Sequence, residues 1–180
     1  METGSSIRPV PSAEDPWASF ADVRAANAAF AEQHVDRHLT GYASRGLAIV
    51  TCMDSRIKPL EAVGMDEGDA KILRNAGARV TEDIIRTLVL ATYLLGVDRI
   101  LIMPHTDCKM ATGGEDEIHA LIWQQFGVDT RSLEFRTVTE QDEALRRDVT
   151  RLRSFPLLRS GVVIVGGIYD VDSGLLQPIA

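Results

Sequence analysis

Two short runs in this sequence carry side chains of the types that bind a transition metal. The first run is Cys52-Met-Asp54-Ser-Arg56, and the second is His105-Thr-Asp-Cys108. Thiolates and imidazoles are ligands that Zn²⁺ prefers, and three protein ligands leave one position for water or substrate. The sequence therefore predicts a Zn²⁺ site formed by Cys52, His105 and Cys108, of the kind that catalyses reactions.

Asp54 and Arg56 are the side chains expected to control the remaining metal position. Zn²⁺ with two thiolates and one neutral imidazole carries no net charge, so it acidifies its water less than a site of three imidazoles would unless neighbouring groups help. A carboxylate at Asp54 could occupy the fourth position, or it could accept a hydrogen bond from a zinc-bound hydroxide. Arg56 could hold that carboxylate by a bidentate pair and keep the position open.

Both runs follow predicted strands. Residues 47–51 and 99–103 are short apolar runs typical of strands buried on both faces. Further strands are predicted at 70–73 and 161–166, helices at 16–38, 59–64, 82–95, 115–126 and 139–153, and a final hairpin at 169–179. Alternating strands and helices indicate an α/β fold with a mostly parallel sheet of about four strands, a C-terminal hairpin strand and helices on both faces. Ligands bind beyond the carboxyl ends of such strands, where Cys52, His105 and Cys108 would meet.

The length of 180 residues is enough for one domain with a core of its own. Residues 1–14 contain Pro, Ser and Gly without periodicity and are predicted to be a flexible arm, with the domain at 15–180. An Ala-rich helix at 16–38, opened by Asp15 and Pro16, precedes the first strand. So long a helix is expected to lie on its own sheet or on a partner subunit.

Charge and composition argue against several classes of protein. The net charge of −7 argues against binding to nucleic acid or to an anionic membrane, because phosphate binding needs a basic face. No apolar run approaches the roughly 20 residues of a membrane helix, and no secretory signal is recognised at the start of the sequence. The two cysteines suggest metal ligands or free thiols more than a structural disulfide. A cytoplasmic location is the expectation.

The two runs together resemble the signature of the β-class carbonic anhydrases. That signature is a Cys-x-Asp-x-Arg element followed by His-x-x-Cys, here at 52–56 and 105–108. The segments Arg74-Asn-Ala-Gly77 and Gly166-Gly-Ile-Tyr-Asp170 are also similar, and the match is dense from 47 to 110. Either run alone would be a weak signal, whereas both runs after predicted strands are specific.

The resemblance implies a function and an assembly. Cys52, His105 and Cys108 would bind Zn²⁺, with Asp54 and Arg56 as the carboxylate–arginine pair beside it. The implied enzyme is a lyase that catalyses reversible hydration of carbon dioxide to bicarbonate, with zinc-bound hydroxide attacking carbon. Members assemble as homodimers or dimers of dimers, with the N-terminal helix packing on a partner subunit.

Alternatives remain open at this stage. Some relatives with the same zinc framework hydrolyse CS₂, so the substrate could be CS₂ or COS, and a different class is a non-catalytic zinc-binding or thiol redox module. Lys109 and Ala78 stand where the family commonly has glycine. Arg74 could serve the site or only clamp a loop.

The remaining histidines give weaker signals. His34 and His38 lie one helical turn apart without a third ligand nearby in the sequence, which favours a solvated helix face. His119 is expected on a helix surface, with a proton-shuttle role as the alternative.

Overall fold

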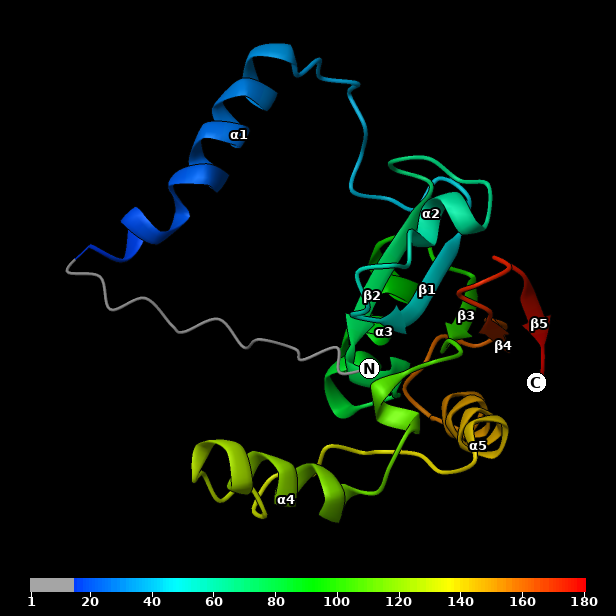
Figure 1. Cartoon of the computed structure of the whole chain (residues 1–180). Helices are drawn as coiled ribbons and strands as arrows, with labels where there is room; N and C mark the ends of the chain where they lie inside the picture. Colours follow the sequence, from blue (N-terminus) through cyan, green and yellow to red (C-terminus); the bar gives the residue numbers. More distant parts are fainter. Residues whose placement is uncertain (1–14) are drawn as a thin grey trace. The chain divides into compact units, whose positions relative to one another are not determined.

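This computed structural model describes residues 15–180, and Figure 1 labels its elements. The strands are β1 (Leu47–Cys52), β2 (Ala70–Asn75), β3 (Arg99–Met103), β4 (Val163–Tyr169) and β5 (Leu176–Pro178). The α-helices are α1 (Ala21–Gln33), α2 (Pro59–Ala62), α3 (Glu82–Leu94), α4 (Glu115–Phe126) and α5 (Gln141–Arg153). Short 3₁₀ turns cover Pro16–Phe20, Ala76–Ala78 and Lys109–Ala111. The predicted flexible arm at 1–14 lies outside the described residues.

The strands form one five-stranded sheet in the order β2-β1-β3-β4-β5. β1 to β4 run parallel, and β5 returns antiparallel to β4. The predicted fold class, a mostly parallel sheet with a C-terminal hairpin strand, is confirmed. β1 and β3 are adjacent central strands, with Thr51 opposite Met103, so the two runs that follow them leave the same edge of the sheet.

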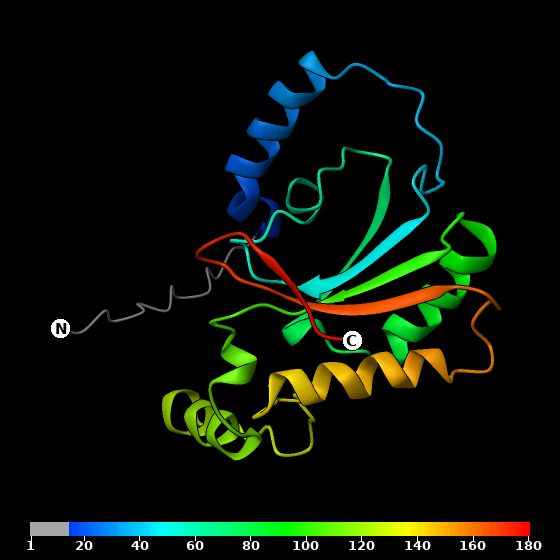
Figure 2. The same ribbon diagram turned by 90° about the vertical axis from the view of Figure 1, so that its right-hand side faces the viewer.

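Helices α3 and α5 cover one face of the sheet (Figure 2). Thr81 caps α3 by accepting a hydrogen bond from the backbone N–H of Ile84, and the two acidic residues that follow suit the positive end of the helix dipole. The apolar face of α3 then packs on the sheet. The buried members of this core include Val50, Ile84, Leu88, Ile100, Ile102, Val149, Leu152 and Ile164.

The opposite face of β1 and β3 packs against the loops that carry the candidate site. Its core consists of Leu47, Ile49, Cys52, Ile57, Leu101, Met103, Cys108 and Met110. Val63 at the end of α2 and Ile118 of α4 pack against this cluster, so helices contribute to both faces as predicted. Because Cys52 and Cys108 belong to this second core, apolar packing holds them in place.

The N-terminal helix ends earlier than predicted. α1 ends at Gln33, and the chain from His34 is not helical, whereas the Ala-rich pattern predicted a helix to residue 38. The Asp36 carboxylate accepts a hydrogen bond from the backbone N–H of His38 at 2.7 Å. This local turn competes with helical hydrogen bonding, and His38 adopts a left-handed φ of 53°.

The described part of the chain divides into two compact units, residues 15–39 and Thr40–Ala180. α1 belongs to the first unit and has no buried residue, while the sheet and both core clusters belong to the second. The domain limits of 15–180 and the packing of α1 on a partner subunit stay predictions. No helix within residues 15–180 has the length and apolar character needed to cross a membrane.

Candidate metal centre

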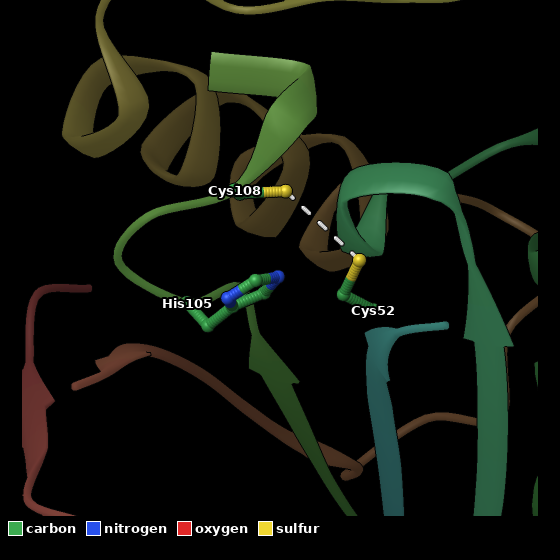
Figure 3. A group of neighbouring side chains, drawn as sticks. All are labelled: Cys52, His105 and Cys108. Carbon is green, nitrogen blue, oxygen red and sulfur yellow. Dashed lines mark hydrogen bonds between the residues drawn. The ribbon is translucent and has the colours of Figure 1, made fainter. Parts of the chain in front are cut away.

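Three side chains converge where β1 and β3 end. Cys52 is the last residue of β1, and His105 and Cys108 lie in the loop after β3. Figure 3 shows the three side chains pointing toward one another. Their ligand atoms all lie within 4.8 Å of one another, and all three residues are buried. In the part of the chain that the structure describes, this is the one such group of three or more possible metal ligands.

The backbone of His105 is held by neighbouring elements. Thr106 N–H donates to the Tyr169 carbonyl at 2.9 Å, and Tyr169 N–H donates to the Pro104 carbonyl at 2.8 Å. The Gln141 side-chain amide donates to the His105 carbonyl at 2.9 Å. β4 and α5 therefore fix the backbone that carries the imidazole. Gln141 could not be predicted as a supporting residue, because nothing in the sequence relates it to a residue 36 positions earlier.

The group fits a metal ion such as Zn²⁺. Nδ1 of His105 lies 2.7 Å from the Thr106 carbonyl, so Nδ1–H donates there and the lone pair of Nε2 faces the two sulfurs. Among residues 15–180, Nε2 is the only buried side-chain nitrogen or oxygen without a hydrogen-bond partner. The sulfurs of Cys52 and Cys108 are 3.9 Å apart, close to the roughly 3.8 Å that tetrahedral geometry requires with Zn–S bonds of about 2.3 Å.

The electrostatics of the two thiols suit a bound cation. A hydrogen bond from Cys108 lowers the pKa of Cys52, and the backbone N–H of Gly77, 3.4 Å from its sulfur, acts in the same direction. The interaction with Cys52 and then burial raise the pKa of Cys108. The pair thus shares one proton where two thiolates would repel each other. A divalent cation removes that repulsion and stabilises both thiolates.

The turn that supplies the Gly77 N–H contains two residues with a left-handed backbone. Gly77 has φ 74° and Ala78 has φ 57°, both in the left-handed region. A Cβ on Gly77 would lie 3.0 Å from the Cβ of Met110, two residues after Cys108. Ala78, which departs from the family's usual glycine, adopts the conformation that glycine would take without strain.

Asp54 and Arg56 form the predicted bidentate pair. Arg56 Nε lies 3.0 Å from Asp54 Oδ1, and Nη2 lies 2.8 Å from Oδ2. The guanidinium and backbone N–H of Arg56 hold the pKa of the Asp54 carboxyl well below its usual range. Asp54 Oδ2 is 3.8 Å from Nε2 of His105. An ionised carboxylate therefore lies beside the three possible ligands.

Arg74 clamps the loop that leaves β1. Its Nε donates to the Cys52 carbonyl at 2.8 Å, and its Nη2 donates to the Asp54 carbonyl. Of the two roles considered for Arg74, these contacts are those of a loop clamp. It supports the site through the backbone of Cys52 and Asp54.

The remaining histidines lie outside the converging group. His38 forms an exposed pair with Asp36, with 3.1 Å between Nδ1 and Oδ2. His34 follows the last residue of α1 and is exposed. His119 lies on α4, where its Nδ1 is 2.8 Å from the Thr130 hydroxyl.

Comparison with known proteins identifies relatives of this site and fold. Residues 47–176 match the protein family described as carbonic anhydrase. Beta-carbonic anhydrase 1 of Mycobacterium tuberculosis is 34% identical over 137 residues, covering 76% of this chain and 83% of the relative. A carbon disulfide hydrolase of Acidithiobacillus thiooxidans is 31% identical over 155 residues, covering 75% and 77%.

A solved structure agrees with these sequence matches. The crystal structure of carbonic anhydrase from Streptococcus mutans superposes with a TM-score of 0.82 at 38% identity, covering 89% of this chain and 97% of the other. Fold and sequence thus agree over the region that contains Cys52, His105 and Cys108. This chain therefore belongs to the β-carbonic anhydrase family and is a lyase of the carbonic anhydrase type.

Proposed function

We propose that this chain catalyses the Zn²⁺-dependent reversible hydration of carbon dioxide to bicarbonate. The observation that carries the proposal is the convergence of two buried sulfurs and an unpartnered imidazole nitrogen beside an ionised carboxylate. Cys52, His105 and Cys108 would hold the ion. When bound, Zn²⁺ supplies a water molecule acidified enough to act as a nucleophile near neutral pH.

Asp54 and Arg56 have distinct tasks in this proposal. Because Arg56 keeps the Asp54 carboxyl ionised, Asp54 accepts a hydrogen bond from the nucleophile and orients its lone pair toward the carbon of CO₂. Arg56 holds Asp54 by two parallel hydrogen bonds, which supports an open metal position over one that Asp54 occupies. In the alternative closed state, Asp54 is the fourth ligand and activity rises with pH.

The central experiment combines metal analysis with stopped-flow CO₂ hydration. Protein purified without chelator is expected to contain about one zinc per chain and to accelerate CO₂ hydration between pH 6.5 and 9. A zinc content well below one per chain would favour a thiol redox module. Zinc-loaded protein without activity across this range, with Asp54 free of the metal, would rule out the carbonic anhydrase assignment.

A second candidate activity is hydrolysis of CS₂ or COS at the same site. The observation that favours it is the 31% identity to a carbon disulfide hydrolase. Release of H₂S from CS₂ or COS, measured beside CO₂ hydration on one zinc-loaded preparation, distinguishes the substrates. CO₂ turnover without H₂S release is the result expected for the first proposal.

We infer that the chain acts in the cytoplasm as a homodimer or a dimer of dimers. The support for assembly is the N-terminal unit, in which α1 has no buried residue and the large apolar side chains of Trp17, Phe20, Val23 and Phe30 are exposed. A partner subunit would cover them. Light scattering coupled to size-exclusion chromatography measures the number of subunits.

A further inference from the structure

The Arg56 guanidinium contacts two loops. On one side it holds Asp54 of its own loop, as described above. On the other side, Nη1 donates to Oδ2 of Asp107 at 2.8 Å, and Nη2 donates to the Asp107 carbonyl at 3.1 Å. Asp107 lies between His105 and Cys108, so Arg56 bridges the loops that follow β1 and β3. The sequence signature His-x-x-Cys assigns no role to Asp107.

Asp107, which accepts both of these hydrogen bonds, has an unusual backbone conformation. Its φ of 53° lies in the left-handed region, which non-glycine residues adopt rarely, although Asp and Asn do so more readily than most. In this conformation the carbonyl and the carboxylate of Asp107 both accept hydrogen bonds from the same guanidinium. The carboxylate itself is 71% exposed, so apolar packing does not explain its position.

The contacts of Arg56 divide between the edges of a rigid, planar group. Nε donates to Asp54 and Nη1 donates to Asp107, while Nη2 donates both to the Asp54 carboxylate and to the Asp107 carbonyl. Fixing Nη1 therefore fixes the plane in which Nε and Nη2 meet the Asp54 carboxylate. Since Asp54 Oδ2 is only 3.8 Å from His105 Nε2, a small rotation of a less firmly held carboxylate would bring it toward the metal ligands.

We propose that Asp107 is a positioning residue that anchors Arg56 so that Asp54 stays paired with the guanidinium and away from the metal position. The proposal rests on the proposed function, because the carboxylate that is steered is the one beside the metal. Asp107 acts through Arg56 and does not itself touch substrate. It would thereby set how often the fourth metal position is open.

The first test uses NMR on metal-free, ¹⁵N-labelled protein. The variant Asp107→Asn keeps the size of the side chain, and asparagine tolerates the left-handed backbone. We expect the Arg56 Nε–H and Nη–H signals, slowed by hydrogen bonding in the unmodified protein, to broaden or to exchange faster. Arg131 provides an internal control, because it holds Asp129 in a second Asp-x-Arg pair away from Asp107. Unchanged Arg56 signals would contradict the anchoring.

The second test measures azide binding to Co²⁺-substituted protein by visible spectroscopy. Azide competes with Asp54 for the fourth metal position, so Asp107→Asn is expected to raise the azide Kd about three- to fivefold, as for loss of an exposed ion pair. Removing the negative charge of Asp107 would by itself strengthen anion binding. A weaker affinity for azide in Asp107→Asn can therefore come only from competition by Asp54. In protein that also carries Asp54→Ala, Asp107→Asn should not weaken azide binding.

The outcomes separate this inference from the proposed function. An unchanged or lower azide Kd in Asp107→Asn, or a weakening that persists without Asp54, overturns the positioning role. If the chain binds no metal, the proposed function fails, while the NMR experiment still decides whether Asp107 anchors Arg56. A shift of the pH–rate profile to higher pH in Asp107→Asn would further support a more occupied fourth position.

Discussion

At the scale of single residues, an Asp-x-Arg ion pair forms twice among the described residues, in different surroundings. Asp129 and Arg131 repeat the contacts of Asp54 and Arg56, with Arg131 Nε 2.9 Å from Asp129 Oδ1. The arginine lowers the pKa of the aspartate in both pairs. Only Asp54 lies beside two buried sulfurs and an unpartnered imidazole. In these two loops the ion pair gives an ionised, oriented carboxylate, and its surroundings decide whether that carboxylate can serve catalysis.

This pair of motifs provides a matched test of Asp54. Asp54→Asn is expected to keep about one zinc per chain and to lower kcat for CO₂ hydration by about 10²- to 10³-fold, because a neutral amide no longer orients the nucleophile. Asp129→Asn, which removes the same kind of ion pair, is expected to leave kcat unchanged. Stopped-flow rates and zinc analysis of both variants check this. Equal effects of the two substitutions would contradict a role for Asp54 in the chemistry.

Cys108 is expected to be required for metal binding. In Cys108→Ser a hydroxyl replaces a thiolate, so the zinc affinity should fall by more than about 100-fold, since even groups that only support ligands change affinity by about 10- to 100-fold. Competition with a chromophoric chelator measures the affinity, and activity should disappear with the metal. Circular dichroism of the variant controls for unfolding. Retention of tight zinc binding would remove Cys108 from the ligand set.

At the scale of elements, the turn after β2 controls the position of Cys52. Gly77→Ala adds a Cβ at φ 74° and 3.0 Å from Met110, so it is expected to lower the free energy of unfolding by about 1–3 kcal/mol and to weaken zinc binding. Ala78→Gly relieves left-handed strain but makes the unfolded chain more flexible, so its effect should lie within about 0.5 kcal/mol. Urea denaturation of both variants measures the free energy of unfolding. A similar loss of stability in Gly77→Ala and Ala78→Gly would contradict the prediction.

Close packing of α5 on β4 gives a second prediction for the elements. A Cβ on Gly166 would lie 2.9 Å from Leu145 Cγ and 3.0 Å from Val149 Cγ2, both side chains of the core. Gly166→Ala should therefore lower the free energy of unfolding by about 1–3 kcal/mol. Gly41→Ala is the control, because a Cβ there meets nothing within 4 Å. Urea denaturation should show almost no change for the control.

At the scale of the whole molecule, the sheet, both cores and the candidate site lie in Thr40–Ala180. A fragment of residues 40–180 is expected to fold and to retain Cys52, His105 and Cys108 as a zinc site. If α1 covers a partner subunit, the fragment should dissociate at protein concentrations where the full chain is dimeric. Light scattering measures the mass of the assembly, and competition with a chelator measures the zinc affinity of the fragment. An unchanged subunit number would contradict the proposed role of α1 in assembly.

The sequence by itself determined the order and type of the main elements and the identity of the three converging side chains. Short apolar runs bounded by glycine or polar residues are local signals for buried strands, and in a parallel sheet the residues that follow adjacent strands must meet at one edge. The spacing of Asp54 and Arg56 likewise determined their pair, because both groups lie within one loop. The end of α1 was predicted wrongly, since the Asp36 turn outweighs the helical preference of the preceding alanines.

Only the tertiary structure decided how the site is supported. The contacts of Gln141 with His105, of Gly77 with Cys52 and of Asp107 with Arg56 join residues 25 to 51 positions apart. Such contacts depend on strand order, on loop conformation and on the left-handed backbone of Asp107. None of these features produces a periodic pattern in the sequence. The ligand types are chemical properties of single residues and can be read from the sequence, whereas the orientation of those ligands depends on packing and appears only when the chain is folded.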